Sequence, residues 1–347
     1  MASTTVRSER ELQNCTFVKT VLMISVLLYH SVLFWGGKWF TADPVVPCAP
    51  LAWLAKWLNS FHIYGFTFIS GYLFYYLKQE KGKYQQYGPF LKGKVRRLLI
   101  PYGFVAAVWV LPVSILWKGF DLSAVLRDFV LGVSPNQLWF LLMLFVVFAL
   151  VWPLSGLMAK RNLLTVVLCL AFYGLGTVGS AVLPNVFQVW TACKYTVFFV
   201  AGFKLRQYGS WLVMRIPGIV WLAADLLLFV LWQWLTRGQS LPVNLLTMGL
   251  GVLVNLVGAL MFFVILQKIA SKTNHRSNRV MGVLAKYAMP VYLFHQQIIY
   301  LSIFLLNGVV HPYWNAAANF LAGFSISLLL SFVLMKFRPT RYLIGEK

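Results

Sequence analysis

Residues 17 to 35 read FVKTVLMISVLLYHSVLFW, a stretch that is long and apolar enough to cross a bilayer as one helix. Lys19 and His30 interrupt it. Ionisable side chains inside a membrane span are costly, and they usually face the protein interior or a watery cavity. The stretch therefore predicts a membrane protein in which these two side chains have a specific role.

The whole chain has the composition of a membrane protein. Of its 347 residues 60% are hydrophobic and 11% are charged, and its mean hydropathy is +0.74; a soluble globular domain has far fewer apolar residues. The formal net charge of +22 is spread over short loops between apolar runs, which the positive-inside rule explains better than nucleic-acid binding does. The four cysteines show neither CxxC spacing nor a shared loop, so no disulfide or zinc site is predicted.

Apolar runs predict about ten transmembrane helices in an all-α, polytopic protein. The runs cover residues 17–35, 58–77, 98–117, 138–158, 163–183, 187–203, 216–235, 243–266, 285–306 and 314–335. No linker or internal repeat divides them, so residues 1–347 are expected to form one membrane domain, with an N-terminal segment 1–16 and a tail 336–347. No cleavage site follows the first span, which is therefore expected to stay uncleaved.

Loop charge predicts the orientation of these helices. Of the 30 Lys and Arg residues six fall on one side, which leaves 24 on the other. The six are Lys38, Lys56, Lys118, Arg127, Lys194 and Arg237. The richer side is expected to be the cytoplasm, and it includes both termini.

Residues 51 to 62, LAWLAKWLNSFH, carry Trp53 and Trp57 four positions apart, beside Lys56. This pattern favours a short amphipathic helix at the outer interface, and an outward extension of the second span is the alternative. Either structure places His62 near the outer surface.

Lys19 and His30 are expected on one face of the first span. They are 11 positions apart, a rotation of about 1,100°, which is about 20° beyond three full turns. Their separation along the helix axis is about 16 Å, so a lysine near the cytoplasmic interface leaves the histidine around mid-depth. The pair predicts a polar track running inward from the cytoplasm.

His295 lies in the ninth span, within KYAMPVYLFHQQIIY, nine residues beyond Lys286 and one turn after Tyr292. It should reach a depth similar to that of His30, so the two histidines could meet in one cavity. Alternatively, each histidine bonds across helices for packing. A functional role is the usual one for such residues and is favoured for His30, while both interpretations stay open for His295.

The run FLKGKVRRLLIPY places Lys94 and Arg97 one helical turn apart at the mouth of the third span. Arginine offers planar, multi-donor phosphate recognition and lysine a point charge, so the pair could hold a phosphorylated cytosolic donor. Simple positive-inside anchoring would explain the same residues without a ligand.

Together these stretches resemble the acyltransferase 3 family of integral-membrane acyltransferases. The resemblance covers most of the chain and rests on VLLYHS at the end of the first span, FHIYGFTFISGYLF at 61–74, KVRRLLIPY at 94–102, NQLWFLLMLF at 136–145 and YAMPVYLFHQQI at 287–298.

The resemblance implies a mostly bacterial, multi-pass protein of the cytoplasmic (inner) membrane. Such proteins use acyl-CoA, commonly acetyl-CoA, as co-substrate to O-acylate surface polysaccharides or other envelope glycans and glycolipids. It implies that His30 is catalytic and that Lys19, Lys94 and Arg97 bind the donor, with lysines at positions where the family pattern has arginines. His62 and His295 fall in recurrent family stretches, and with Tyr292 they are expected to line the active site.

The expected chemistry agrees with this resemblance. Acyl transfer to a hydroxyl needs a base, for which histidine is suited, and a cationic site for the CoA phosphates. No Ser-x-Gly nucleophile elbow is visible, so direct transfer without a bound cofactor or metal is the simpler mechanism.

Two other functions remain open. A transporter or flippase of a lipid-linked or anionic saccharide would also have about ten helices and a basic cytoplasmic side, although no internal repeat or pair of broken helices supports it. A non-catalytic partner of an envelope synthase would tolerate replacement of His30, whereas neither active function should.

Overall fold

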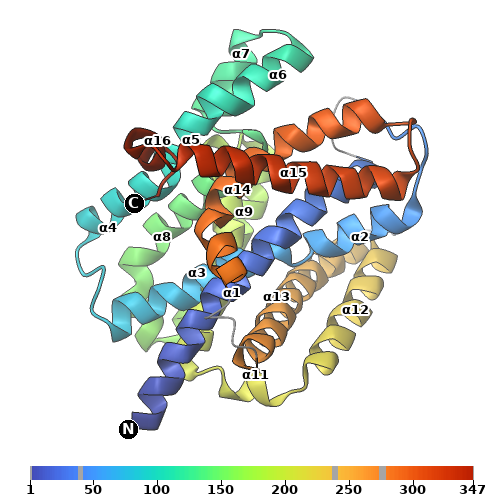
Figure 1. The fold of residues 1–347 in the computed structure, drawn as a ribbon. Helices are drawn as coiled ribbons and strands as arrows, with labels where there is room; N and C mark the ends of the chain where they lie inside the picture. The colour runs from blue at the N-terminus through green and yellow to red at the C-terminus, as the bar shows by residue number, and fades with distance from the viewer. Residues whose placement is uncertain (1, 38–41, 237–240, 273–278, 347) are drawn as a thin grey trace.

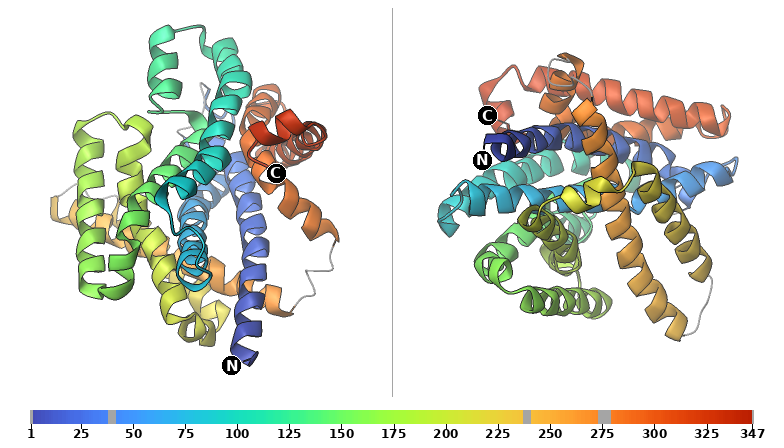
Figure 2. Two further views of the ribbon diagram at one scale, coloured as in Figure 1. Left: turned by 90° about the vertical axis from the view of Figure 1, so that its left-hand side faces the viewer. Right: turned by 90° about the horizontal axis from the view of Figure 1, so that it is seen from below.

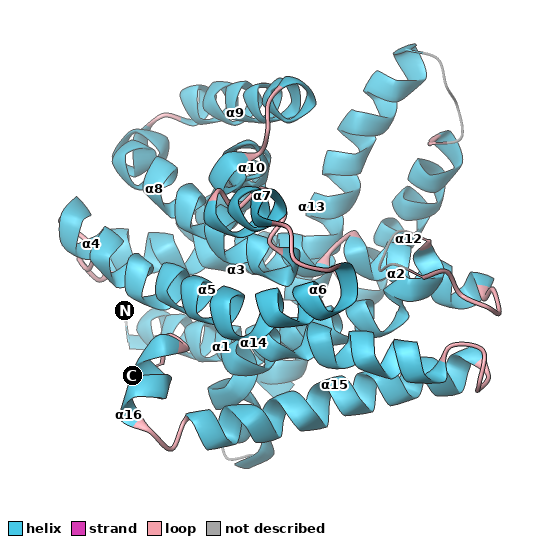
Figure 3. Ribbon diagram, turned by 90° about the horizontal axis from the view of Figure 1, so that it is seen from above, coloured by secondary structure: helices cyan, strands magenta, loops and turns pink. Residues whose placement is uncertain are grey.

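The computed structural model describes residues 2–37, 42–236, 241–272 and 279–346. All regular secondary structure within these ranges is helical, as Figure 3 shows, so the all-α fold is confirmed. Nine helices in the described ranges are long and apolar enough to cross a membrane. They correspond to α1 (Ala2–Val32), the segment from α4 (Tyr87–Lys94) to α6 (Leu111–Lys118), α8 (Trp139–Lys160), α9 (Asn162–Val182), α10 (Val189–Tyr208), α12 (Gly218–Leu235), α13 (Leu241–Lys272), α14 (Arg279–Leu306) and α15 (Pro312–Leu334).

The second expected span, 58–77, is helical but differs from these nine. It forms α3 (His62–Tyr75), continued by a π-helical segment, η2 (Tyr76–Glu80). Nine of the 14 residues of α3 are buried. Because other helices rather than lipid surround it, this helix tolerates the tyrosines, glycines and histidine that make it less apolar.

Helix α1 runs through the middle of the bundle, where it packs against α3, α13, α14 and α15 (Figure 1). Val18, Leu22 and Val26 on this helix are almost completely buried. The span that carries Lys19 and His30 is therefore enclosed by protein, as a helix with ionisable side chains must be in a bilayer.

Helices α3 and α10 touch backbone to backbone through two glycines. A Cβ atom at Gly71 would lie 1.8 Å from the carbonyl oxygen of Phe199, and one at Gly202 would lie 1.8 Å from that of Phe68. No larger residue fits at either position, which is the usual way for membrane helices to approach closely. The contact fixes α3, and with it His62, beside the centre of the bundle.

The outer helices carry apolar side chains outward. In α9, at the edge of the molecule in both views of Figure 2, Leu163, Leu170 and Val178 are 79%, 68% and 62% exposed. Such a surface suits lipid contact.

The amphipathic segment before α3 is a separate helix. It forms α2 (Ala49–Asn59), which ends before the turn at Ser60 and Phe61, so it does not extend the second span. Leu51, Ala55 and Leu58 are buried, while Trp53 is 41% exposed.

Contacts near the helix ends show which ends lie on the same side of the bundle. Glu80 at the end of η2 pairs with Arg206 near the end of α10 at 2.6 Å, and Lys78 donates to the carbonyl oxygen of Trp152 in α8 at 2.8 Å. At the other end, Asn307 after α14 donates to the carbonyl oxygen of Asp43 at 3.0 Å. Loops that charge assigns to the same side therefore meet, while the side that faces the cytoplasm stays a prediction.

Two of the six basic residues assigned to the outer side, Lys38 and Arg237, lie outside the described residues. The tail 336–347 includes a short helix, α16 (Arg338–Leu343), which returns to the bundle, where Tyr342 stacks under Arg96 with 5.0 Å from guanidinium carbon to ring centroid.

We predict that a reporter fused after Lys83 or after residue 347 is cytoplasmic and that one placed near Asp43 or Asp121 is outside. The reason is the 24 to 6 distribution of basic residues. Paired phosphatase and fluorescent-protein fusions measure the side. A cytoplasmic signal at Asp121 would contradict the arrangement.

Candidate active site

A cavity of about 360 Å³, here called the inner cavity, lies between α1, α3, α4, α8 and α14. Three cationic side chains line it: Lys19 from α1, Lys94 from α4 (Tyr87–Lys94) and Arg97 from η3 (Val95–Leu99). The three residues expected to bind the donor thus lie in one cavity although they come from two separate spans.

The inner cavity has an excess of positive charge. The charge of Arg97 acts on both Lys19 and Lys94, so the three groups are close neighbours. The Nζ atom of Lys94 lies 3.5 Å from the ring centroid of Phe148, a cation–π contact that stabilises the ammonium. Among the described residues that line the cavity, the one carboxylate is that of Glu346. Burial raises the pKa of Glu346, and the nearby Arg97 opposes that shift.

The helix that carries Lys94 and Arg97 changes type between them. Helix α4 ends at Lys94, and Arg97 lies in the π-helical η3. Both side chains nevertheless line the inner cavity.

A second cavity, here called the outer cavity, has a volume of about 250 Å³ and lies among α1, α2, α3, α14 and the segment before α8. His30, His62 and Tyr292 line it. His295 is not among its described lining residues, and it contacts the ring of His30 instead, with ring centroids 4.9 Å apart. Three of the four residues expected at the catalytic centre thus border the outer cavity. The fourth, His295, packs against His30.

The hydrogen bonds of His30 and His295 assign their tautomers. The Nδ1 atom of His295 lies 2.8 Å from the carbonyl oxygen of Tyr292, and Nδ1 of His30 lies 3.0 Å from that of Val26. A carbonyl oxygen only accepts, so we assign a proton to Nδ1 of each ring. The one hydrogen on Nδ1 of His30 is then shared between the carbonyl oxygen of Val26 and Nε2 of His295, which lies 3.1 Å from that nitrogen. The basic nitrogen of His30 is therefore Nε2.

His62 follows the same pattern. Its Nδ1 atom lies 2.6 Å from the carbonyl oxygen of Leu58, which assigns the proton to Nδ1 and the lone pair to Nε2. The ring of Tyr29 contacts the rings of both His62 and His30, with centroid distances of 4.6 Å and 5.0 Å.

The two cavities share one wall. Ile63, Phe140 and Tyr292 line both of them. The hydroxyl of Tyr292 donates to the carbonyl oxygen of Gln137, which fixes the tyrosine ring. Lys19 borders the inner cavity and His30 the outer one, so the track predicted along α1 consists of two cavities and a thin wall between them.

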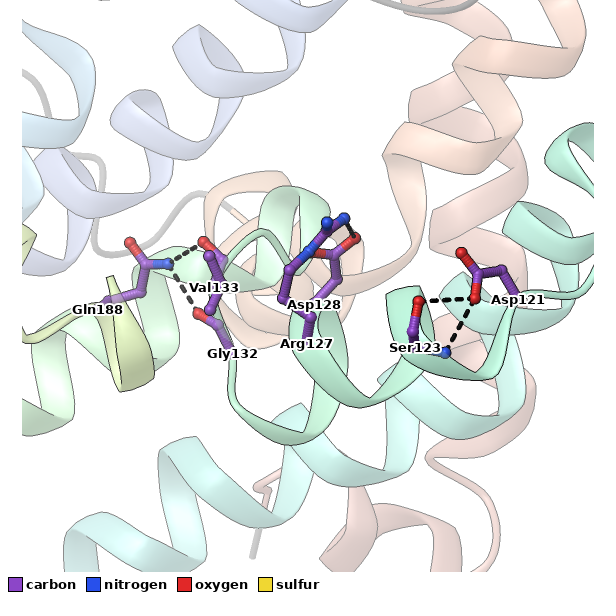
Figure 4. Close-up of polar contacts among 7 residues, drawn as sticks. All are labelled: Asp121, Ser123, Arg127, Asp128, Gly132, Val133 and Gln188. Atoms are coloured by element: carbon purple, nitrogen blue, oxygen red, sulfur yellow. Dashed lines mark hydrogen bonds and ion pairs between the residues drawn. The ribbon is translucent and has the colours of Figure 1, made fainter. Parts of the chain in front are cut away.

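Hydrogen bonds from Gln188 anchor the segment before α8. Figure 4 shows the side chain of Gln188 donating to the carbonyl oxygens of Gly132 and Val133, each at 2.8 Å. In the same view Asp121 caps the start of α7 (Leu122–Val125) by accepting from Ser123. The anchored loop leads into Asn136 and Gln137, which line the outer cavity.

Several lining residues were not predicted from the sequence. The outer cavity includes four amide side chains, those of Asn59, Asn136, Gln137 and Gln296, and the inner cavity includes Glu346. Amide side chains in or beside apolar spans could have indicated these lining positions, because such groups need hydrogen-bond partners in a membrane. Glu346 gave no signal, because its position depends on how the tail folds back.

Of three comparisons with known proteins, one found a match. A family model described as an acyltransferase domain matches residues 14–336, nearly the whole chain. No curated protein matches the chain, and no solved structure matches it. The match spans both cavities apart from the tail residues, and the chain therefore belongs to the acyltransferase 3 family.

Proposed function

We propose that the protein transfers an acyl group, acetyl in the simplest case, from cytosolic acyl-CoA to a hydroxyl of an envelope glycan or glycolipid. The observation that carries the proposal is the pair of cavities, one cationic and one bordered by His30, which share a wall. Membership of an acyltransferase family supports the reaction class. The proposed location is the inner membrane of a bacterium, with acyl-CoA as a co-substrate and no nucleic acid as a partner.

The inner cavity suits the donor. Phosphate groups form strong, charge-assisted hydrogen bonds with lysine and arginine. The inner cavity offers two lysine ammonium groups, those of Lys19 and Lys94, and the guanidinium of Arg97. Beyond these charges the lining becomes apolar, with Met23, Val26 and others leading to the shared wall. A CoA thioester has the matching polarity, since its phosphates are anionic and its acyl end is neutral.

The outer cavity suits the acceptor and the base. In the proposed step, Nε2 of His30 removes the proton from an acceptor hydroxyl while the hydroxyl oxygen attacks the thioester carbonyl carbon. The new C–O bond forms, the C–S bond breaks, and the departing sulfur takes the proton from the imidazolium. The products are the ester and CoA, and His30 returns to its starting state.

His295 acts as a positioning residue in this proposal. Its Nε2 accepts from Nδ1 of His30, so it keeps the reactive lone pair on the opposite nitrogen. When His30 takes up a proton, the same contact stabilises the positive charge that forms. This is the arrangement by which a third group orients a catalytic base.

We predict that replacing both Lys94 and Arg97 with Gln raises the Kd for acetyl-CoA by about 10- to 100-fold, because charged hydrogen bonds contribute about 1.5–3 kcal/mol each and can be partly replaced. Binding of labelled acetyl-CoA to purified protein in nanodiscs measures the effect.

The matched control replaces Lys83 and Lys92 with Gln. Both are exposed residues of the same basic region, and neither lines a cavity among the described residues. The control loses the same charge but should keep its donor affinity. Equal affinities in the two double variants would reduce Lys94 and Arg97 to topological anchors.

We predict that His30→Ala and His30→Asn both insert normally, bind acetyl-CoA and lose acyl transfer, since loss of a general base costs about 10²- to 10⁴-fold in rate. Mass spectrometry of envelope glycans from cells with the wild-type gene, the variants or no gene measures the transferred acyl groups, whichever glycan accepts them. The asparagine variant retains a hydrogen-bonding amide but cannot take up the proton at neutral pH.

His311→Ala serves as the control, because His311 is exposed at the start of α15 and lines neither cavity among the described residues. It should acylate normally. Normal acylation by His30→Asn would instead assign His30 a packing role, and saccharide transport without any acylation would favour a transporter.

A further inference from the structure

The described lining of the outer cavity is polar but has no acidic or basic side chain apart from histidine, although the adjoining inner cavity is cationic. Among its described lining residues there is no Asp, Glu, Lys or Arg. Its polar groups are amides, tyrosines and histidines, whereas the inner cavity has Lys19, Lys94, Arg97 and Glu346. A carboxylate or ammonium group on a ligand would find no charged partner among these described lining residues, and an unpaired charge in such a site is strongly unfavourable.

Aromatic rings and amides occur side by side in this cavity. Tyr29, Trp139, Phe140 and Tyr300 supply ring surfaces, and Asn59 and Asn136 supply hydrogen-bonding groups. Small-molecule sites combine apolar walls with a few polar groups that fix orientation. A sugar ring has the complementary structure, with C–H faces and a rim of hydroxyls.

Gln296 has an unmet hydrogen-bonding requirement at this site. Its Nε2 atom donates to the hydroxyl of Tyr300 at 2.6 Å, and its Oε1 atom is buried without a partner. If the amide were turned around, the unpartnered end would be the NH₂ group instead. A ligand hydroxyl both donates and accepts, so it satisfies either orientation.

The neighbouring glutamines show that such an amide need not be left unpaired. Gln137 and Gln297 bond to each other in both directions, at 2.8 and 3.2 Å. Gln296 directly follows His295 in the sequence and is as deeply buried as Gln137 and Gln297. It lines the same cavity as His30. Buried polar atoms without partners are uncommon and often mark a functional position.

We infer that the outer cavity binds an uncharged, hydroxyl-bearing sugar ring and that Gln296 is the residue that positions its hydroxyls beside His30. The inference rests on the proposed function and narrows its acceptor to a neutral saccharide unit. Gln296 is a specificity-determining residue here, and His30 remains the base.

Saturation-transfer NMR on the protein in nanodiscs tests the charge preference without requiring turnover. The probes are the methyl pyranosides of glucose, galactose and mannose, together with the methyl glycosides of the three matching uronic acids. At least one neutral glycoside should bind at least 10-fold more tightly than its uronic-acid counterpart. Binding of the uronic acids with equal or greater affinity, or binding of no neutral glycoside, would overturn the inference.

Gln296→Met tests the residue, because methionine keeps the side-chain length and volume but removes both polar ends. The variant should lose at least 10-fold in affinity for the neutral glycoside and raise the KM for acceptor, while acetyl-CoA binding stays unchanged. The control is Gln267→Met, at a buried glutamine of α13 that lines neither cavity among the described residues. Unchanged glycoside affinity in Gln296→Met would refute the role of Gln296.

The two proposals fail separately. Charge-selective glycoside binding that depends on Gln296, in a protein that acylates nothing, would retain the sugar site and remove the transferase. Acylation of envelope glycans combined with no preference for neutral glycosides would retain the transferase and remove the neutral-sugar site. If Gln296→Met fails to fold, the glycoside series on the unaltered protein still decides the charge preference.

Discussion

The ring of His30 on α1 meets the ring of His295 on α14 inside a helix bundle, where lipid offers no hydrogen-bond partner to either. Each ring uses a carbonyl of its own helix for one nitrogen, and the two rings share a further contact at 3.1 Å. This contact requires α1 to lie against α14. It also assigns the basic lone pair of His30 to Nε2, the nitrogen that the proposed proton transfer uses.

The positions of the two cavities follow from this central helix. About three turns of α1 separate Lys19 from His30, and the structure uses that distance to place one residue at a cationic cavity and the other at a neutral one. Ile63, Phe140 and Tyr292 form the wall between the two cavities, and in the proposed reaction this wall would separate the donor from the acceptor except at the reacting groups. Under this proposal an anionic donor and an uncharged acceptor each have a cavity of matching polarity.

Much of the fold followed from the sequence because helical periodicity and loop charge are local properties. The helical class and most spans were predicted. The packed environment of α3 was not, because its cause is the tertiary contact of Gly71 and Gly202 with α10. The π-helical segment that contains Arg97 and the position of Glu346 likewise depend on packing. The same is true of the unpartnered amide oxygen of Gln296, which no spacing rule reveals.

In the proposed reaction the acyl group passes from one side of the membrane to the other through the wall between the cavities. Sealed vesicles of known orientation test this passage, with labelled acetyl-CoA supplied to one side and envelope glycolipid or glycan acceptor confined to the other. We expect labelled acceptor when acetyl-CoA is on the Lys19 side and none when the two substrates are exchanged. Transfer that occurs only with both substrates on the same side would contradict the proposed passage.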